Sequence, residues 1–302
     1  MTDYKSIYDF ALANGCEATF NEPLKKHTSF KIGGNAALFV VPQTDNALSA
    51  ILKKCSDENI RTVIIGNGSN LLVSDDGIDA VVILMTRENG EIRLVDETEI
   101  YCDAGVSLTK VCRFALENSL SGLEFAFGIP GSVGGAVFMN AGAYGGEIKD
   151  VITKCDYIAP DGVSGQLSKE DLLLGYRTSV FNKNNCVITG AQFKLNKDSQ
   201  DAIKERMNDF LARRKSKQPL EYPSAGSTFK RPEGYFAGAL IEQSGLKGFS
   251  VGGAQVSEKH AGFVINKGDA TARDVMDLVE YIQKKVKEDS GVDLEPEIRI
   301  FS

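Results

Sequence analysis

The stretch of residues 128–146 constrains the fold more than any other, because it holds seven glycines among nineteen residues. Glycine loses the most backbone freedom on folding, so this density disfavours both a helix and a strand. A surface loop is the ordinary interpretation. However, apolar residues interleave with the glycines, and Ser132 and Asn140 add short polar side chains, which a solvated linker does not need. We therefore predict a backbone that lies close to a ligand and directs N–H groups at an anion such as a pyrophosphate.

A second glycine loop, residues 66–72, follows an apolar run at 61–65 that predicts a buried strand. It begins like the G-x-G-x-x-G dinucleotide fingerprint, but Leu71 stands at the third glycine position and no helical pattern follows. The chain also has no Gly-Lys dipeptide. These features exclude a Rossmann unit and a P-loop.

Charge and composition restrict the partners. The 302 residues include 34 Lys and Arg against 41 Asp and Glu, and the net charge of −7 disfavours nucleic-acid binding. Six cysteines without a C-x-x-C pair indicate reduced thiols, and two histidines without a Cys/His cluster disfavour a zinc site. The early charges of the N-terminus and the lack of a long apolar run predict neither a signal peptide nor a membrane span. We expect a cytoplasmic protein.

The hydrophobic pattern alternates between helical and strand periods along the chain. Thr44, Ser107 and Thr271 are the expected helix N-caps, the last with Asp274 in a capping box. The mixture predicts an α+β fold with domains at 1–88, 89–196 and 197–302, the last strand being able to return to an earlier domain. The predicted helices are 3–14, 44–55, 107–121, 169–175, 198–214, 236–244 and 271–286; the predicted strands are 37–42, 61–65, 80–84, a hairpin at 91–103, 151–158, 186–195, 263–266 and 295–301.

Five motifs in a fixed order make the sequence specific. They are Gly66-Asn-Gly-Ser-Asn70, Gly128-Ile-Pro-Gly-Ser-Val-Gly-Gly135, Tyr176-Arg-Thr-Ser179, Gly226-Ser-Thr-Phe-Lys230 and Glu295-Pro-Glu-Ile-Arg299. Each motif alone is modest, but together they closely resemble the UDP-N-acetylenolpyruvoylglucosamine reductase (MurB) family. The resemblance extends from about His27 to the C-terminus. The chain is most similar to the shorter, type II form of the family.

The resemblance implies a flavoenzyme of the vanillyl-alcohol-oxidase (PCMH) type, with two α+β subdomains around non-covalent FAD and a C-terminal α+β substrate-binding domain. Such enzymes use NADPH to reduce the enolpyruvyl ether of UDP-N-acetylglucosamine to UDP-N-acetylmuramate in the cytoplasm, which supports peptidoglycan synthesis, cell-wall formation, cell shape and cell division. We expect small-molecule substrates, no nucleic-acid or membrane partner, and a monomer. The residues that the resemblance assigns to FAD are Gly66, Asn67, Gly68, Ser69, Asn70, Leu71, Gly128, Pro130, Gly131, Ser132, Gly134, Gly135, Asn140, Ala141, Gly142 and Val187.

Three residues match the catalytic positions of the family: Ser227, Arg177 and Glu297. Hydride addition to one alkene carbon leaves a doubly negative enolate, which needs cations and hydrogen-bond donors in a dry site. Arg177 offers a planar fork to the carboxylate. Glu297 helps only when protonated or hydrogen-bonded to the anion, and burial favours the neutral form of a carboxyl group. Ser227 is the expected proton donor to the other carbon, with its proton relayed from elsewhere because a hydroxyl is a weak acid.

The family motifs also suggest residues for the diphosphate and the sugar, and these are Lys217, Lys230, Gln255, Lys259 and His260. Two other functions stay open. A different FAD-dependent oxidase or dehydrogenase of the same fold, acting on a hydroxy acid or an alcohol, would need neither Ser227 nor Glu297. A non-catalytic nucleotide-binding module would be colourless and would show no turnover.

Overall fold

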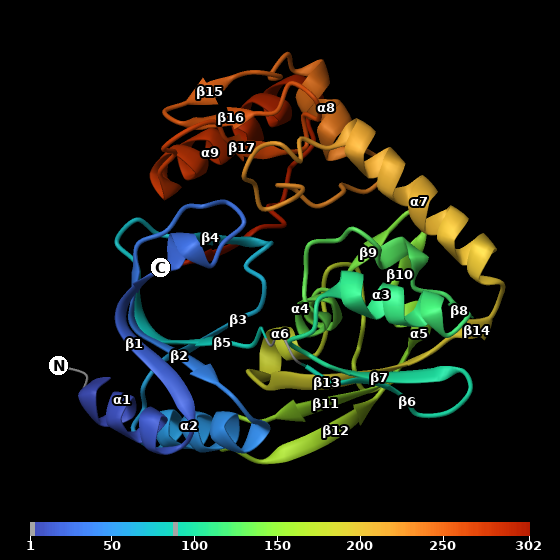
Figure 1. Ribbon diagram of the computed structural model, residues 1–302. Helices are drawn as coiled ribbons and strands as arrows, with labels where there is room; N and C mark the ends of the chain where they lie inside the picture. The colour runs from blue at the N-terminus through green and yellow to red at the C-terminus, as the bar shows by residue number, and fades with distance from the viewer. Residues whose placement is uncertain (1–3, 87–89) are drawn as a thin grey trace. The chain divides into compact units, whose positions relative to one another are not determined.

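The computed structural model describes residues 4–86 and 90–302, and the chain forms two units, each assembled from separated segments (Figure 1). The chain passes from one unit to the other inside the loop of residues 66–71. The predicted domain boundary at 88/89 lies outside the described residues, and the predicted division there and at 196/197 into cofactor-binding and substrate-binding domains stays a prediction. Unit 1 contains residues up to Phe20, Leu38–Asn67 and Ala80–Arg213; unit 2 contains Asn21–Ala37, Gly68–Asp79 and Arg214–Ser302.

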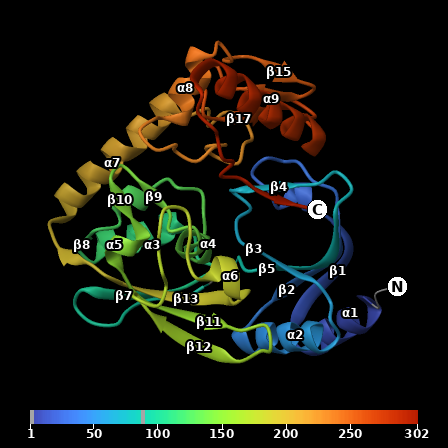
Figure 2. The ribbon, with the colours of Figure 1, turned by 180° about the vertical axis from the view of Figure 1, so that it is seen from behind.

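The first sheet has the strand order β1-β2-β5-β3 and packs against two helices. Its strands are β1 (Cys16–Pro23), β2 (Asn35–Pro42), β5 (Ile78–Leu84) and β3 (Thr62–Ile65). Helices α1 (Tyr4–Ala13) and α2 (Asp45–Asp57) lie side by side in both ribbon views (Figure 2). Thr44 begins α2 by accepting a hydrogen bond from the Ala47 N–H at 3.1 Å, as predicted. The shared core contains Ile7, Ala11, Leu38, Val40, Leu48, Ile51, Leu52, Val81 and Ile83.

The second sheet of unit 1 is antiparallel throughout, with the order β12-β11-β13-β7-β6. Its strands are β6 (Ile92–Leu94), β7 (Glu99–Asp103), β11 (Ile152–Ile158), β12 (Ser164–Ser168) and β13 (Val187–Lys194). The predicted hairpin at 91–103 and the predicted strands at 151–158 and 186–195 are therefore confirmed. Helix α3 (Leu108–Glu117) begins after Ser107, whose Oγ accepts from the Lys110 N–H, and its apolar face joins the core of this sheet.

Two predictions for unit 1 were wrong. Residues 169–173 form turns rather than a helix. Conversely, the glycine-rich stretch contains a helix, α4 (Val133–Phe138), which the glycine content argued against. A Cβ atom added to Gly134 would lie only 3.0 Å from the Cβ of Ala104, so a glycine lets this helix pack closely. The short elements around it are β8 (Leu120–Ser121), η2 (Glu124–Ala126), β9 (Gly142–Ala143), β10 (Gly146–Glu147), α5 (Ile148–Val151), α6 (Phe181–Asn184) and β14 (Asn196–Lys197).

Helix α7 (Gln200–Lys217) is fixed to the rest of unit 1 by an ion pair and an aromatic stack. The Arg206 guanidinium lies 2.7 Å from Oε1 of the buried Glu124 and 2.6 Å from Oδ2 of Asp198. Phe210 stacks on Tyr144, with ring centroids 4.7 Å apart. These contacts hold the helix that follows the second sheet along the chain.

Unit 2 packs helices against a small antiparallel sheet, β15-β16-β17. Its elements are β15 (Ser250–Val251), β16 (Ala254–Val256), β17 (Val264–Asn266), α8 (Ala237–Gln243), α9 (Ala272–Ser290) and the short η1 (Leu24–Lys26). The capping box of Thr271 and Asp274 forms at the start of α9 as predicted. One face of α9 supplies the largest share of the core, with Val275, Leu278, Val279, Ile282 and Val286.

The end of the chain returns to an early strand. Strand β18 (Arg299–Phe301) pairs in parallel with β4 (Leu71–Val73), with Arg299 opposite Leu71. Of the predicted strand at 295–301, these last residues form a strand, and Pro296 forms an isolated bridge with Phe229. The pairing answers the question that the sequence left open about where the last strand packs.

Across residues 4–86 and 90–302, no helix combines the length and the hydropathy needed to cross a membrane. The same residues hold no group of three or more His, Cys, Asp or Glu side chains arranged for a metal ion. All six cysteines are free thiols, and five of them are buried.

Candidate functional site

The two glycine loops meet inside unit 1. A Cβ atom added to Gly66 would lie 2.5 Å from the Oγ of Ser132, closer than real side chains approach. Ser132 begins α4 and accepts a hydrogen bond from the Gly135 N–H at 3.3 Å. Gly66 is partly exposed and Gly135 is exposed. The Ser132 side chain therefore lies against Gly66, and the backbone of both glycines stays at least partly accessible.

Several N–H groups of the glycine-rich stretch are used within the protein. The N–H of Val133 donates to the Val106 carbonyl at 2.9 Å, and the N–H of Gly134 donates to the Ala104 carbonyl at 2.8 Å. These two N–H groups consequently do not point at a ligand. Gly134 lets two backbone segments approach closely, and Gly135, which follows it, is exposed.

Arg177 lies in a tight turn in which Gly175 and Thr178 exchange backbone hydrogen bonds of 3.1 and 3.4 Å. Its backbone is left-handed, with a φ of 55°, which is unfavourable for a residue with a Cβ atom unless other contacts hold it. The guanidinium donates to the Gly142 carbonyl at 3.4 Å and lies 5.1 Å from the centre of the Tyr176 ring. The side chain is half-buried.

Asn140 is fully buried, and its side chain is engaged by protein atoms. Its Nδ2 donates to Oε2 of Glu147 and to the carbonyl of Gly175, both at 2.9 Å, and its Oδ1 accepts from the Lys149 N–H at 2.9 Å. Hydrogen bonding to Lys149 holds the pKa of Glu147 below its usual value, so that carboxylate stays ionised. The amide of Asn140 is thus occupied, although the resemblance assigns this residue to FAD.

In unit 2, the second half of the glycine loop is held by backbone contacts. Gly68 has a φ of 59°, and a Cβ atom there would overlap the carbonyl oxygen of His27. Ser29 donates from its N–H to the Gly68 carbonyl at 3.1 Å and from its Oγ to the Ser224 carbonyl at 2.6 Å. Ser29 was not among the residues predicted from the sequence. Its place in the polar run before Gly33 and Gly34 is the only sequence feature that pointed to it. This serine joins the loop to the segment that precedes Ser227.

Ser227 and Glu297 lie on neighbouring segments of unit 2. The Glu297 N–H donates to the Thr228 carbonyl at 2.8 Å, and Phe229 forms an antiparallel bridge with Pro296. Ser227 is exposed and Glu297 is half-buried. The structure therefore brings together two of the three predicted catalytic residues, and it places Arg177 in unit 1.

The glycine loop of residues 66–72 contacts the segment that contains Glu297. The Nδ2 of Asn70 donates to the Glu297 carbonyl at 3.1 Å, and the Arg299 N–H donates to the Asn70 carbonyl at 2.9 Å. Burial lowers the pKa of the Arg299 guanidinium. Arg299 was quoted in the last motif but given no role; its partial burial beside Glu297 makes it a functional candidate that only the structure reveals.

The predicted sugar-nucleotide residues all belong to unit 2, in different settings. Lys217 is exposed at the end of α7, and Lys230 forms an ion pair with Glu295. Lys259 donates to the Lys215 carbonyl at 2.9 Å. These three lysines are the only ones of the set that can offer a positive charge at neutral pH.

Gln255 and His260 have few groups left for a ligand. Gln255 donates to the Gly248 carbonyl at 3.1 Å and accepts from Lys267 Nζ at 3.3 Å. Burial lowers the pKa of His260, so its ring is neutral near pH 7, and its Nδ1 accepts from the Gly262 N–H at 3.1 Å. In this arrangement Nε2 bears the ring proton and is the atom that can donate to a ligand.

Other residues assigned to FAD by the resemblance differ in access. Val187 is buried at the start of β13, and Leu71 pairs with Arg299 in β4. Those with accessible or partly accessible atoms are Asn67, Ser69, Gly128, Pro130, Gly131, Ala141 and Gly142.

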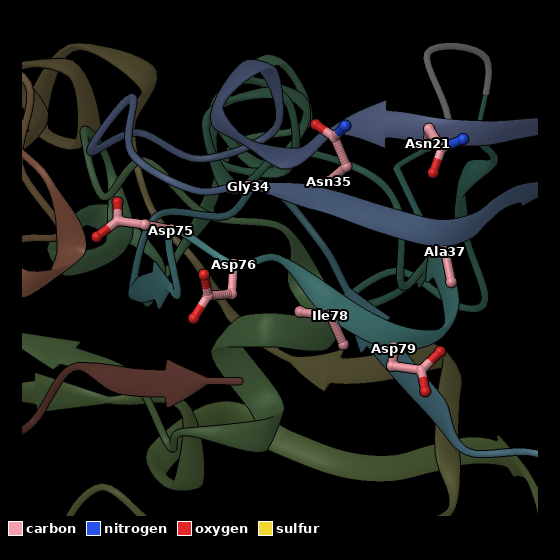
Figure 3. A pocket seen from close by; sticks show the side chains of 8 residues that line it. All are labelled: Asn21, Gly34, Asn35, Ala37, Asp75, Asp76, Ile78 and Asp79. Carbon is pink, nitrogen blue, oxygen red and sulfur yellow. The ribbon is translucent and has the colours of Figure 1, made fainter.

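A separate pocket of about 420 Å³ in unit 2 contains none of the predicted site residues. Figure 3 shows its lining, which includes the aspartates at 75, 76 and 79. Asp75 accepts from the N–H groups of Ala272 and Arg273 at 2.8 and 3.1 Å, so it caps α9. The concentration of carboxylates opposes the binding of a diphosphate there.

The accessible backbone at Gly66 and Gly135, together with the Ser132 hydroxyl, fits FAD. A flavin dinucleotide combines a flat ring system with a pyrophosphate, and both need backbone that is not shielded by side chains. Gly66 has no room even for a methyl group, because Ser132 lies against it. The assignment of Gly66, Ser132 and Gly135 to the cofactor stays a prediction.

Comparisons with known proteins agree with this organisation. Residues 36–165 match the family model of an FAD binding domain, and residues 218–301 match that of the UDP-N-acetylenolpyruvoylglucosamine reductase C-terminal domain. The UDP-N-acetylenolpyruvoylglucosamine reductase of Clostridium botulinum (strain 657 / Type Ba4) is 54% identical over 303 residues, covering 100% of this chain and 98% of the relative. The protein of the same name from Syntrophomonas wolfei is 47% identical over 297 residues, 98% of each chain.

A solved structure is similar over almost the whole chain. The crystal structure of UDP-N-acetylenolpyruvylglucosamine reductase (MurB) from Thermus caldophilus superposes with a TM-score of 0.79 at 34% identity, covering 95% of this chain and 99% of that one. The predicted α+β fold with an FAD-binding part and a C-terminal domain of this family is confirmed. The chain belongs to the UDP-N-acetylenolpyruvoylglucosamine reductase family.

Proposed function

We propose that this chain reduces the enolpyruvyl ether of UDP-N-acetylglucosamine to UDP-N-acetylmuramate, with NADPH as reductant and FAD as cofactor. Full-length similarity to reductases of this name supports the activity, and the match to an FAD-binding domain supports the cofactor. The structural observation that favours this reaction over another flavin reaction is the pairing of the segments that contain Ser227 and Glu297. A hydroxy-acid oxidase would need neither Ser227 nor Glu297, because its reaction does not require protonation of an enolate.

FAD, held near Gly66, Ser132 and Gly135, would supply hydride-transfer chemistry toward one carbon of the enolpyruvyl double bond, with NADPH as the source of the two electrons. The remaining tasks belong to this chain's own residues. Addition of the hydride pushes the electron pair of the double bond toward the adjacent carboxylate. Arg177 binds this carboxylate through its planar fork, which opposes the growing negative charge better than a single ammonium group would.

Ser227 donates the proton that completes the reaction. Its exposed Oγ transfers a proton to the second alkene carbon, the C–H bond forms, and the electron pair of the enolate is consumed. The serine alkoxide that results must take a proton from solvent or from a neighbouring group. Glu297 lies on the adjacent segment. It would help only when protonated or hydrogen-bonded to the developing anion, since a charged carboxylate would oppose that anion.

Lys217, Lys230 and Lys259 supply the positive charge for the diphosphate. A chain with a net charge of −7 needs a local cluster of cations to attract this ligand. Lys230 already pairs with Glu295, so the substrate diphosphate must compete with that carboxylate for it. Gln255 and the Nε2 of His260 complete the proposed contacts with the sugar nucleotide.

The product supports peptidoglycan synthesis, and through it cell shape and cell division. The free thiols and the nucleotide-linked substrates favour a cytoplasmic location. We keep a monomer as the expected oligomeric state, which light scattering checks directly.

An anaerobic two-step titration tests the function. Purified yellow protein is first mixed with NADPH, which bleaches the flavin, and the enolpyruvyl sugar nucleotide is then added. Return of the flavin absorbance with formation of UDP-N-acetylmuramate supports the reductase. Return only on admission of oxygen indicates an oxidase, and colourless protein that does not take up FAD contradicts the proposal altogether.

A further inference from the structure

Residues 138–142, in the second half of the glycine-rich stretch, hold the turn that contains Arg177. Every second residue of this segment contacts the turn of residues 175–179, although the two are far apart in sequence. The three contacts run from Ser179 Oγ to the Phe138 carbonyl at 2.8 Å, from Asn140 Nδ2 to the Gly175 carbonyl at 2.9 Å, and from Arg177 to the Gly142 carbonyl at 3.4 Å.

Asn140 is the centre of this arrangement. It is fully buried, and besides Gly175 it contacts Glu147 and Lys149 on the hairpin and helix that follow. Its own backbone is left-handed, with a φ of 42°, a conformation that asparagine tolerates better than most residues. One side chain therefore ties the turn to two other segments of unit 1.

The turn needs such support. Arg177 has a φ of 55°, which is sterically unfavourable, and the turn's own hydrogen bonds between Gly175 and Thr178 are 3.1 and 3.4 Å long. Strained conformations of this kind persist only where surrounding contacts hold them. The Asn140 amide donates to the carbonyl of Gly175, the residue that begins the turn.

We propose that Asn140 is a positioning residue, which fixes the turn that presents Arg177 to the substrate carboxylate. This inference rests on the proposed function, in which Arg177 binds that carboxylate. The resemblance to known reductases assigned Asn140 to FAD. The structure instead gives its amide to Gly175, Glu147 and Lys149, so its effect on catalysis passes through the orientation of Arg177.

The sharpest variant is Asn140→Asp, which keeps the size of the side chain and its tolerance of the left-handed backbone. It removes both N–H donors and sets a carboxylate against the Gly175 carbonyl and the Glu147 carboxylate. A second substitution, Glu147→Gln, removes the repulsion between the two carboxylates and restores a hydrogen bond between residues 140 and 147. It does not restore the bond to Gly175, so the double variant isolates that contact.

The readout is anaerobic stopped-flow kinetics of the two half-reactions on FAD-loaded protein. We expect flavin reduction by NADPH to stay within about 3-fold of the parent. Reoxidation by the enolpyruvyl substrate is expected to fall about 100-fold in Asn140→Asp and to stay low in the double variant, because a small misplacement of a binding group costs about that much. Recovery of the parent rate in the double variant would overturn the proposal.

A double-mutant cycle separates positioning from a general structural role. In an Arg177→Ala background, Asn140→Asp is expected to cost less than about 3-fold, since the group that it orients is gone. The matched control is Asn266→Asp in unit 2, another buried asparagine whose side chain bonds Phe30, Gly268 and Ala270. Its effect is expected to multiply with that of Arg177→Ala.

The remaining outcomes also decide the matter. An Asn140→Asp effect that multiplies with Arg177→Ala contradicts positioning. A parent-like reoxidation rate in Arg177→Ala alone contradicts the role of Arg177 in the proposed function, whatever Asn140 does. If Asn140→Asp does not fold, as judged by circular dichroism, Ser179→Ala tests the same contact set: a loss of about 10-fold that disappears in the Arg177→Ala background supports the proposal, and an additive loss opposes it.

Discussion

The backbone N–H of Glu297 donates to the carbonyl oxygen of Thr228 at 2.8 Å. This bond places the last sequence motif alongside the one that contains Ser227. The glycine loop of residues 66–72 contacts the same segment, because the Asn70 side chain donates a hydrogen bond to the Glu297 carbonyl. Residues of three of the five motifs, Asn70, Thr228 and Glu297, thus contact one another within unit 2.

Ser227→Ala is expected to leave flavin reduction by NADPH unchanged and to lower product formation by about 100-fold or more, because proton transfer by a positioned group contributes on that scale. Stopped-flow reduction and a chromatographic assay of UDP-N-acetylmuramate measure the two steps. Ser164→Ala, on an exposed position of β12, serves as the control. Turnover of Ser227→Ala near the parent rate would show that another group donates the proton.

Arg177→Lys is expected to fail almost as completely as Arg177→Ala, although it keeps the positive charge. A lysine ammonium cannot reproduce the planar fork that binds a carboxylate through two parallel bonds. Steady-state kcat/KM for the enolpyruvyl substrate measures the loss, which we put at about 100-fold or more. Arg273→Lys, an exposed arginine paired with Asp277, is the matched control. Near-normal activity of Arg177→Lys would contradict binding of the carboxylate through two parallel guanidinium bonds.

Gly68→Ala is expected to lower the free energy of unfolding by about 3 kcal/mol, since it combines a left-handed backbone with steric overlap. The new methyl group would collide with the His27 carbonyl oxygen. Gly245→Ala is the control, because Gly245 also has a positive φ of 71° but open space around the added Cβ atom. Urea unfolding measures the free energy of unfolding of both variants. Equal losses in Gly68→Ala and Gly245→Ala would mean that the backbone around His27 shifts enough to remove the collision.

Glu124→Gln tests an ion pair within unit 1. Burial alone would raise the pKa of Glu124, but hydrogen bonds from Arg206, Gly122 and Ser121 outweigh it and lower the pKa below the usual value. Because the folded-state pKa is lower than the unfolded one, the ionised carboxylate stabilises the fold above the unfolded pKa. This stabilisation is lost as the pH falls through the folded-state pKa.

At pH 7 we expect Glu124→Gln to lower the free energy of unfolding by about 2 kcal/mol, since it weakens hydrogen bonds to a charged group. The difference from the parent should shrink below about pH 4, near the reference pKa of glutamate. Urea unfolding at a series of pH values measures this trend. Glu117→Gln, which is exposed, should stay within about 0.5 kcal/mol of the parent. A constant difference across the series contradicts the assignment.

The sequence was sufficient where the cause of a structure lies within a few residues. The N-caps at Thr44, Ser107 and Thr271 were predicted and are observed, because a cap bonds an N–H group three residues away. Strands β6, β7, β11 and β13 of the second sheet followed from their hydrophobic pattern, whereas β12 was not predicted. Family motifs, read in order, also identified the chemistry.

The sequence was not sufficient where a local structure depends on a contact with a distant segment. The glycines of residues 128–146 predicted a loop around an anion, yet Gly134 lies in a helix, where an added Cβ atom would come within 3.0 Å of the Ala104 Cβ atom. Strand β1 was not predicted, because half of its residues are polar and only Cys16 is buried.

The sequence by itself thus determined the N-caps at 44, 107 and 271, several of the strands, the family, and the identity of Ser227, Arg177 and Glu297 as candidates. Only the tertiary structure decided that β18 pairs with β4, that Glu297 lies beside Thr228, and that the amide of Asn140 belongs to the Arg177 turn. Caps and periodicity arise between neighbours in the chain, whereas these contacts join residues far apart in sequence and depend on how whole segments pack.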